Sequence, residues 1–457
     1  MYECWIQLRN ELIFEAAPWN LEERCESVCR RYRKRYKNAP EEERREAGQL
    51  LKELAVDLCS YLPRWNMKDV SRFVLESGSK RLLETAAELG GQELVSQAEE
   101  EKAAFADSRL IQMTELKENK KSGTAWGNDN ALGIMECMRK GASFVTTNPP
   151  IVNTARKEKP EEFDRVRDEI NRRYPDEPVE KRVSRFTLEA VLNNCRALRS
   201  VYRLTGAKEG YVNYQVNPKN FEDSEKMIQE IEFAYEELSR RLNGKPNVVF
   251  KVPGTAASLE TVRQVTAEGI GVNITVDFAV SQMKAFADVI EQGIADKSFV
   301  TVMAGRLDGP VAEDLKEAGV ENADVLCREA SRLVTKRAYE ELLPGYKKTE
   351  LLVASLRGPW NFDASLAPGG GASMVISAFP DKAGEFDGLG RGKLCSTLTK
   401  PVDENALADL EKSETFRKAY EPDAMKPEEF AAYGPVQATL SGFISVYEEL
   451  EEYMAQP

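Results

Sequence analysis

Residues 247–276 read NVVFKVPGTAASLETVRQVTAEGIGVNITV, and this stretch decides the fold. It opens and closes with a short apolar run, NVVFKV (247–252) and GVNITV (271–276), and the residues between the two runs have the mixed pattern of an amphipathic helix. Two short buried strands joined by a helix form a βαβ unit, in which the strands lie parallel. The stretch therefore predicts a parallel sheet covered by helices.

The same alternation of apolar run and helix extends from about residue 122 towards the C-terminus. The helical pattern FTLEAVLNNCRALRSVY (186–202), for example, repeats its apolar residues near a period of 3.6. Eight strand-like runs are present, and eight parallel strands close a (β/α)8 TIM barrel, so we predict an α/β fold of that type. An open doubly wound sheet is the alternative, but the GxGxxG sequence common in such sheets is missing. The runs are 122–126, 142–147, 210–216, 247–252, 271–276, 298–304, 350–355 and 373–379.

Helical segments flank the predicted barrel on both sides. Residues 1–118 form a helical N-terminal extension in this interpretation, and residues 119–457 form the barrel with C-terminal helices. Within the extension, leucines 50, 51, 54, 58 and 62 make one apolar stripe, and Pro63 is expected to end that helix. The last segment, PVQATLSGFISVYEELEEYM (435–454), has an apolar face with which it can dock onto the barrel.

Composition limits the classes of function. The chain has 457 residues, of which 42% are hydrophobic and 30% charged, and its net charge is −13. An acidic protein is poorly suited to bind nucleic acid or anionic membranes. No run approaches the roughly 20 apolar residues of a membrane-spanning helix, and no secretory signal is visible. We therefore expect a cytoplasmic enzyme with no nucleic-acid or membrane partner.

The chain contains no histidine. This absence excludes Ser-His and Cys-His nucleophile pairs, zinc sites with histidine ligands and imidazole acid–base catalysis. The eight cysteines form no CxxC pair, which argues against zinc. Proton transfer must then use Asp, Glu, Lys, Tyr or Cys, and we expect neither a metal nor a cofactor.

Lys251 is the most informative charged residue, because it lies inside an apolar run. A lysine in a buried strand is desolvated, which lowers its pKa and frees the amine to attack a carbonyl and form a Schiff base. The alternative is a lysine at the end of a strand whose ammonium group reaches solvent.

Polar residues also occur at the ends of the other predicted strands. Because a barrel builds its active site at the carboxyl ends of its strands, these side chains are expected to meet there. Asn273 and Thr275 lie two residues apart and so point to the same side, towards the barrel interior. The remaining candidates are Asp129, Asn148, Gln215, Thr301, Arg306, Ser355 and Arg357.

Five segments carry a resemblance to a known family. FVTTNPP (144–150) is similar to the TTNPS signature of the transaldolase family, and VVFKVPGT (248–255) resembles the segment around that family's Schiff-base lysine. GVNITVDFAVSQ (271–282) resembles the strand and helix that follow. MAGRLD (303–308) and ASLRG (354–358) resemble the two phosphate-binding segments. The similarity runs from about residue 122 to about residue 357.

The resemblance implies a role for each candidate. Lys251 would form the Schiff base with a ketose, and Asp129, with Asn128 as the competing match, would move the proton during carbon–carbon cleavage. Thr275 would help to hold the water used in imine chemistry. Sugar hydroxyls would be bound by Asn148, Asn273 and Thr301, and a terminal phosphate by Arg306, Ser355 and Arg357.

The sequence also departs from the family pattern. Gln215 stands where many transaldolases have a water-holding glutamate. In this amide the chain resembles the related fructose-6-phosphate aldolases, yet Met303 stands where those aldolases have a tyrosine. The resemblance implies a cytoplasmic transferase of the pentose phosphate pathway that moves a dihydroxyacetone unit between sugar phosphates. The alternatives are a lyase that releases dihydroxyacetone and a barrel without catalytic activity. A PLP enzyme, which also needs a lysine, and a homo-oligomeric assembly stay open.

Overall fold

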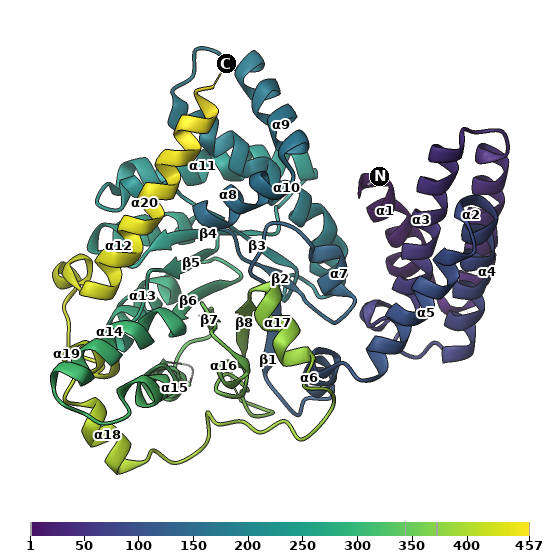
Figure 1. Ribbon diagram of the computed structural model, residues 1–457. Coiled ribbons are helices and arrows are strands. Elements are labelled where there is room, and N and C mark those ends of the chain that lie inside the picture. Colours follow the sequence, from purple (N-terminus) through teal and green to yellow (C-terminus); the bar gives the residue numbers. More distant parts are fainter. Residues whose placement is uncertain (1, 343, 372, 457) are drawn as a thin grey trace.

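The central sheet is a closed barrel of eight parallel strands in sequential order, β1 to β8 (Figure 1). The computed structural model describes residues 2–342, 344–371 and 373–456. Each strand overlaps one predicted run, so the predicted TIM barrel is confirmed and the open sheet is wrong. The strands are β1 (Thr124–Asn128), β2 (Phe144–Val145), β3 (Tyr211–Gln215), β4 (Val248–Pro253), β5 (Val272–Thr275), β6 (Ser298–Met303), β7 (Thr349–Ala354) and β8 (Met374–Ala378).

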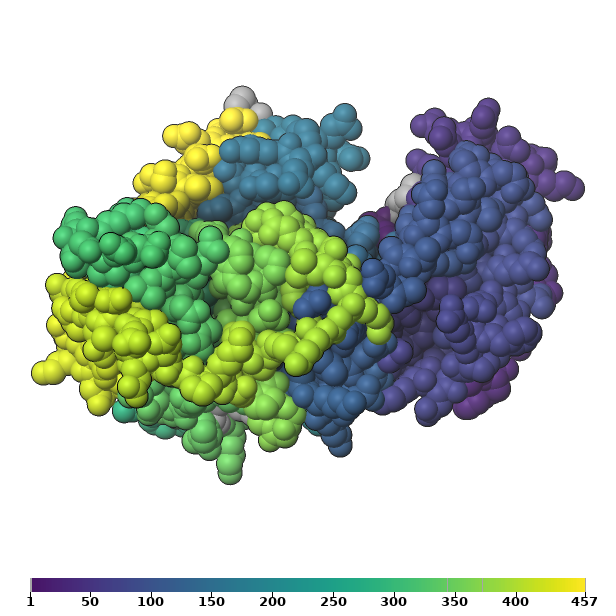
Figure 2. All heavy atoms as spheres, turned by 60° about the horizontal axis from the view of Figure 1, so that its bottom comes forward, coloured from purple at the N-terminus to yellow at the C-terminus, as the bar shows by residue number. Residues whose placement is uncertain are grey.

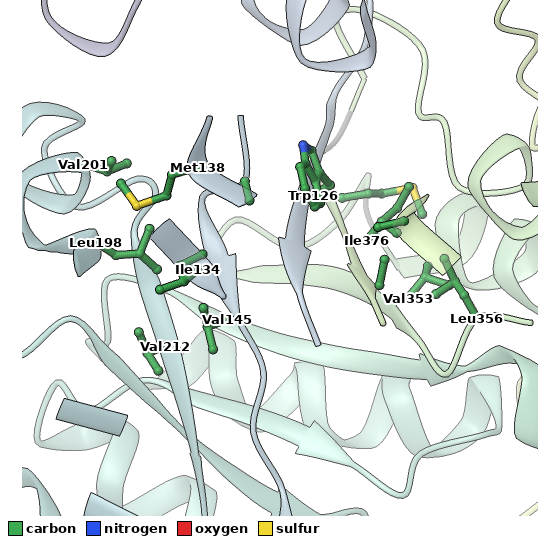
Figure 3. Close-up of a cluster of buried hydrophobic side chains, with 14 of the residues drawn as sticks. Trp126, Ile134, Met138, Val145, Leu198, Val201, Val212, Val353, Leu356 and Ile376 are labelled. Carbon is green, nitrogen blue, oxygen red and sulfur yellow. The ribbon is translucent and has the colours of Figure 1, made fainter. Parts of the chain in front are cut away.

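Helices cover the outside of the barrel. Outward-facing strand residues such as Val145 and Val212 pack with Ile134 and Leu198 of the covering helices (Figure 3). These helices are α7 (Ile134–Met138), α8 (Pro149–Glu158), α9 (Pro160–Arg173), α10 (Val179–Leu204), α11 (Ser224–Leu242), α12 (Ala256–Ala267), α13 (Val280–Gln292), α14 (Ala304–Glu317), α15 (Ala323–Leu342), α16 (Pro359–Asp363), α17 (Pro380–Asp387), α18 (Glu404–Leu410), α19 (Glu414–Tyr420) and α20 (Gly434–Met454).

The inward-facing residues divide the barrel interior into an apolar floor and a polar upper layer. Phe144 and Phe299 meet edge to face across the floor, with 5.0 Å between their ring centroids. Val249, Leu352 and Val375 complete this cluster. Because strand side chains alternate between the two faces, the next inward residues towards the carboxyl ends form the layer in which polar side chains gather.

The N-terminal residues form a lobe of helices beside the barrel, as expected (Figures 1 and 2). One detail of the prediction is wrong: α3 ends at Leu58, before Pro63. The Ser60 hydroxyl donates to the Asp57 carbonyl and accepts from the Leu62 backbone N–H, so the chain turns before the proline is reached. The helices are α1 (Tyr2–Arg9), α2 (Leu21–Tyr36), α3 (Glu41–Leu58), α4 (Arg72–Gly90), α5 (Glu93–Ala106) and α6 (Arg109–Glu118). The domain boundary at residue 118 stays a prediction.

The final helix, α20, docks on the barrel as predicted. It packs on α8 and α10 and buries Phe443, Tyr447 and Leu450. No helix in the described part of the chain is both long and apolar enough to cross a membrane.

A buried cluster of charges joins the helical lobe to the barrel. Asp57 of α3 accepts from Arg9 of α1 and from Arg139 at the end of α7, both at 2.7 Å. Trp5 donates to the same carboxylate and lies under both guanidinium groups. Burial disfavours the charged carboxylate, but the two arginines hold the pKa of Asp57 below its usual value. Asp57 therefore connects both parts of the molecule, together with Glu53 and Glu101 of the lobe, which also pair with Arg139.

We predict that Asp57→Ala lowers the free energy of unfolding by about 3–5 kcal/mol, because it leaves the Arg9 guanidinium buried without a carboxylate partner and removes one of the three carboxylates that Arg139 contacts. Denaturant unfolding measures this change. Glu76→Ala, which breaks the exposed pair between Arg72 and Glu76, is the control and should cost about 0.5 kcal/mol or less. Equal losses for the two variants would contradict the prediction.

Candidate active site

Lys251 lies within β4, between two strands that contribute predicted site residues. Backbone pairing aligns Gln215 of β3 and Asn273 of β5 with Lys251. Closure of the sheet brings the other candidates to the same end of the barrel. The residues that follow or end the neighbouring strands there are Asp129, Asn148, Thr275, Thr301, Arg306, Ser355 and Arg357.

The Lys251 amine is almost completely buried, with 3% of the residue exposed. Burial lowers its pKa to about 8, the positive charge of Arg306 acts in the same direction, and Asp129 opposes the shift. Among the described residues, no carboxylate lies within ion-pair distance of this amine. At pH 7 roughly one amine in ten is therefore neutral, compared with fewer than about one in a thousand for an ordinary lysine.

Asp129 is the acidic group of the site. It is buried, and burial raises the pKa of its carboxyl, while Lys251, Thr146 and Arg306 oppose the shift. Asn128, the competing match, instead donates from its amide to two backbone carbonyls in the turn after β1. The geometry therefore favours Asp129 over Asn128 as the group that faces Lys251.

A chain of hydrogen bonds orients the amide groups in the polar layer. The Thr301 hydroxyl donates to Asn273 Oδ1, and Asn273 Nδ2 donates to Asn213 Oδ1, both at 2.7 Å. Asn213 Nδ2 donates in turn to the carbonyl of Val145. The sequence analysis missed Asn213, although its position two residues before Gln215 places both on the same face of β3.

Two buried oxygens near Lys251 have no hydrogen-bond partner in the described part of the chain. They are Thr275 Oγ1 and Gln215 Oε1. Buried polar atoms are normally satisfied, so both are available to bind water or substrate. Asn148 is half-buried, and its side-chain oxygen accepts from the N–H of Ile151 at the start of α8, which fixes the amide at the barrel mouth.

Arg306 and Arg357 form a cationic end of the site. Burial lowers the pKa of Arg306, and repulsion from Arg357 acts in the same direction. Neither arginine forms an ion pair with a described carboxylate, so two unneutralised guanidinium groups face the barrel mouth. Such a pair suits a phosphate, which guanidinium groups bind through paired hydrogen bonds. Phe443 of α20 packs against Arg306, with 5.4 Å between guanidinium carbon and ring centroid.

Gly305 allows the segments carrying the two arginines to approach each other. A Cβ atom at this position would lie 2.3 Å from the Ser355 carbonyl oxygen and 2.4 Å from Arg357 Cγ. Ser355 itself has a φ of 60°, which is uncommon for a residue other than glycine. Close packing of these two segments thus places Ser355 and Arg357 beside Arg306.

The arrangement has the parts needed for covalent chemistry on a carbonyl. A partly neutral amine can attack the carbonyl carbon, and a nearby carboxyl can accept or return a proton. The polar layer offers hydrogen bonds to hydroxyl groups, and the cationic end can bind an anion. Together these features can support covalent chemistry on a carbonyl compound that carries an anionic group.

Comparisons with known proteins identify relatives of this chain. A family model described as Transaldolase/Fructose-6-phosphate aldolase matches residues 133–369, just over half of the chain. A transaldolase of Thiobacillus denitrificans is 26% identical over 241 residues, covering 50% of this chain and 65% of the relative. Transaldolase 2 of Nostoc sp. is 28% identical over 198 residues, covering 36% and 51%. The chain thus spans between about half and two-thirds of the length of these relatives.

The family match contains Lys251 and all the strands from β2 to β7. Asp129 and β8 lie outside the matched segment. Closure of the barrel places them beside the matched residues. With the fold and the matched segment in agreement, the chain belongs to the transaldolase/fructose-6-phosphate aldolase family.

Proposed function

We propose that this protein is a transaldolase, which moves a dihydroxyacetone unit from a ketose phosphate to an aldose phosphate through a Schiff base on Lys251. The observation that supports this proposal is that the Lys251 amine is buried and has a lowered pKa. The negative charge of Asp129 and the positive charge of Arg306 both act on this amine. Arg306, Arg357 and Ser355 would hold the substrate phosphate at the cationic end of the site. The substrate carbonyl would then reach the Lys251 amine.

In the proposed reaction Lys251 attacks the ketose carbonyl, and loss of water gives the imine. Thr275 and Gln215 bind this water, while Asn148, Asn273 and Thr301 bind the sugar hydroxyls. Asp129 takes the proton of the hydroxyl beside the bond that breaks, and an aldose phosphate leaves. The three-carbon unit stays on Lys251 as an enamine until its nucleophilic carbon attacks the carbonyl of a second aldose phosphate, whose oxygen receives the proton back from Asp129. Water then hydrolyses the new imine, which releases the ketose phosphate and frees the Lys251 amine.

Electrostatics explain why two arginines are needed. The net charge of −13 produces a field that repels an anionic substrate. Arg306 and Arg357 have no carboxylate partner among the described residues, so their positive charge is available locally to offset that field.

Borohydride trapping tests the Schiff base. We expect reduction in the presence of fructose 6-phosphate to leave a three-carbon adduct on the peptide that contains Lys251, detected by mass spectrometry, and none in Lys251→Met. Lys52 is an internal control, because it is equally buried, at 3% exposed, but is paired with Glu53 and Glu101 and should stay unlabelled. Labelling of Lys52 or survival of the adduct in Lys251→Met would contradict the assignment.

The pH dependence of trapping follows from the lowered pKa of Lys251. Because only the neutral amine attacks, the initial trapping rate should rise about tenfold per pH unit below pH 7 and level off above about pH 8. In Asp129→Asn, which lacks the carboxyl group needed for cleavage, the midpoint for trapping the imine of the whole ketose should move to lower pH, since the substitution removes the negative charge that raises this pKa. A trapping rate that still rises between pH 9 and 10 would show that Lys251 has the pKa of an ordinary lysine, which would contradict this prediction.

Substitution of Arg306 tests the phosphate site. We expect Arg306→Ala to raise KM for an aldose phosphate acceptor about 10- to 100-fold, the effect of losing a charge-assisted hydrogen bond. The KM for unphosphorylated glyceraldehyde should change little. Arg263→Ala, which removes an exposed arginine on α12 paired with Glu260, is the control. An unchanged KM in Arg306→Ala would remove Arg306 from the phosphate site.

A lyase that releases free dihydroxyacetone is the second candidate, and Gln215 is the observation that favours it. An amide can hold water but cannot take a proton from it. Whether the three-carbon unit is transferred or released as dihydroxyacetone therefore depends on position 215. Measuring free dihydroxyacetone with and without an aldose phosphate acceptor separates the two functions. A transferase releases it slowly without acceptor, whereas a lyase releases it at the full rate.

A further inference from the structure

Two hydroxyl groups extend from Asp129 across the barrel interior, and the proposed mechanism does not use them. Thr146, directly after β2, donates from Oγ1 to Asp129 Oδ1 at 2.5 Å. The same oxygen of Thr146 is hydrogen-bonded to Oγ of Ser377 in β8, and either hydroxyl can be the donor. All three side chains are buried, and the two hydroxyl residues are completely so.

The contact between Thr146 and Ser377 spans a whole strand, because β1 lies between β2 and β8. Gly127 of β1 pairs with Ser377 and has no side chain to separate the two hydroxyls. A Cβ atom at Gly127 would lie 2.6 Å from Cβ of Phe144 on β2. The glycine thus allows the close approach of neighbouring strands that joins Asp129, Thr146 and Ser377 into one chain.

We propose that Thr146 and Ser377 are positioning residues that form a hydroxyl relay for Asp129 and reverse direction each time Asp129 gains or gives up its proton. This inference rests on the proposed function, in which Asp129 carries the proton of carbon–carbon cleavage. Neither hydroxyl touches the substrate; both act through the carboxyl group.

The direction of each hydrogen bond follows from the proton count. With Asp129 ionised, Thr146 donates to the carboxylate and Ser377 donates to Thr146. When Asp129 takes the substrate proton, its carboxyl O–H donates to Thr146 Oγ1, and Thr146 turns its own proton towards Ser377. No proton leaves the relay: the carboxyl group turns its protonated oxygen towards Thr146, and the Ser377 O–H rotates away from Thr146. Asp129 therefore keeps a hydrogen-bond partner in both states, although it is buried away from water.

The relay also adjusts how readily Asp129 ionises. The charged groups that face Asp129 are Lys251 of β4 and Arg306 of α14, and both favour the carboxylate, as does the hydrogen bond from Thr146. Burial acts in the opposite direction. Loss of the Thr146 hydroxyl should thus raise the pKa of Asp129 and leave less carboxylate at neutral pH.

Thr146→Val tests the relay. We expect kcat for transfer to fall about 10- to 100-fold, with KM for the phosphorylated acceptor unchanged and the acidic limb of the rate profile moved to higher pH. Thr146→Ser restores the hydroxyl and should return most of the activity. Thr335→Val is the matched control, because it removes a buried hydroxyl that only bonds within its own helix, and it should leave kcat unchanged.

A double-variant cycle separates a relay from independent packing effects. Ser377→Ala should lower kcat several-fold in the wild-type background and have no further effect in Thr146→Val, because the chain is already broken there. Equal effects of Ser377→Ala in both backgrounds, or an unmoved pH profile in Thr146→Val, would overturn the relay. If thermal unfolding shows that Thr146→Val is not folded, the test rests on Ser377→Ala alone. An unchanged kcat in Ser377→Ala then overturns the proposal.

Trapping distinguishes failure of this inference from failure of the proposed function. If the wild-type protein forms no Lys251 adduct, the Schiff-base function itself is wrong. If wild-type and Thr146→Val proteins are labelled equally and also turn over equally, the function stands and the relay is wrong. Equal final labelling that is reached more slowly in Thr146→Val, because the three-carbon adduct forms only after cleavage, together with slower turnover, supports both.

Discussion

Burial of one amine in the interior of a closed barrel is the constraint on which the site depends. The same desolvation lowers the pKa of Lys251 and raises the pKa of Asp129, so the two values move towards each other and towards neutrality. Their mutual attraction limits both shifts. Desolvation thus accounts both for an amine that can act as a nucleophile and for a carboxyl that can exchange a proton. Neither a histidine nor a second base is needed.

The barrel architecture makes this burial possible. The apolar floor that includes Phe144 and Phe299 closes the interior from below, and the polar layer lies above it. Amide and hydroxyl groups in that layer are held by hydrogen bonds between strands, so a substrate meets groups that are already oriented. Arg306, supported by Phe443 of the last helix, places positive charge at the open end. The helical lobe is joined elsewhere, through Asp57 and its two arginines.

The members of the site differ in whether they lie within the segment that matches the family. The family match covers Lys251, Asn273, Thr301 and the two arginines, whereas Asp129 and Ser377 lie outside it. Gln215 aligns with Lys251 on the neighbouring strand, where an amide can hold water without acting as a base. In the proposed function, the residues that hold the imine water carry the difference between transfer and release, while the amine and the cationic end are common to both reactions.

The eight strands, the covering helices and the helical extension follow from the amino-acid sequence alone, because apolar periodicity reports directly which face of each element is buried. The sequence also singled out Lys251, since a charged residue inside an apolar run is conspicuous. It left Asn128 and Asp129 as alternatives, and it missed Asn213, Thr146 and Ser377. Their importance comes from contacts between strands distant in sequence. Only closure of the barrel brings β8 beside β1, and the hydroxyls on either side of β1 meet across Gly127, so these contacts exist in the tertiary structure alone.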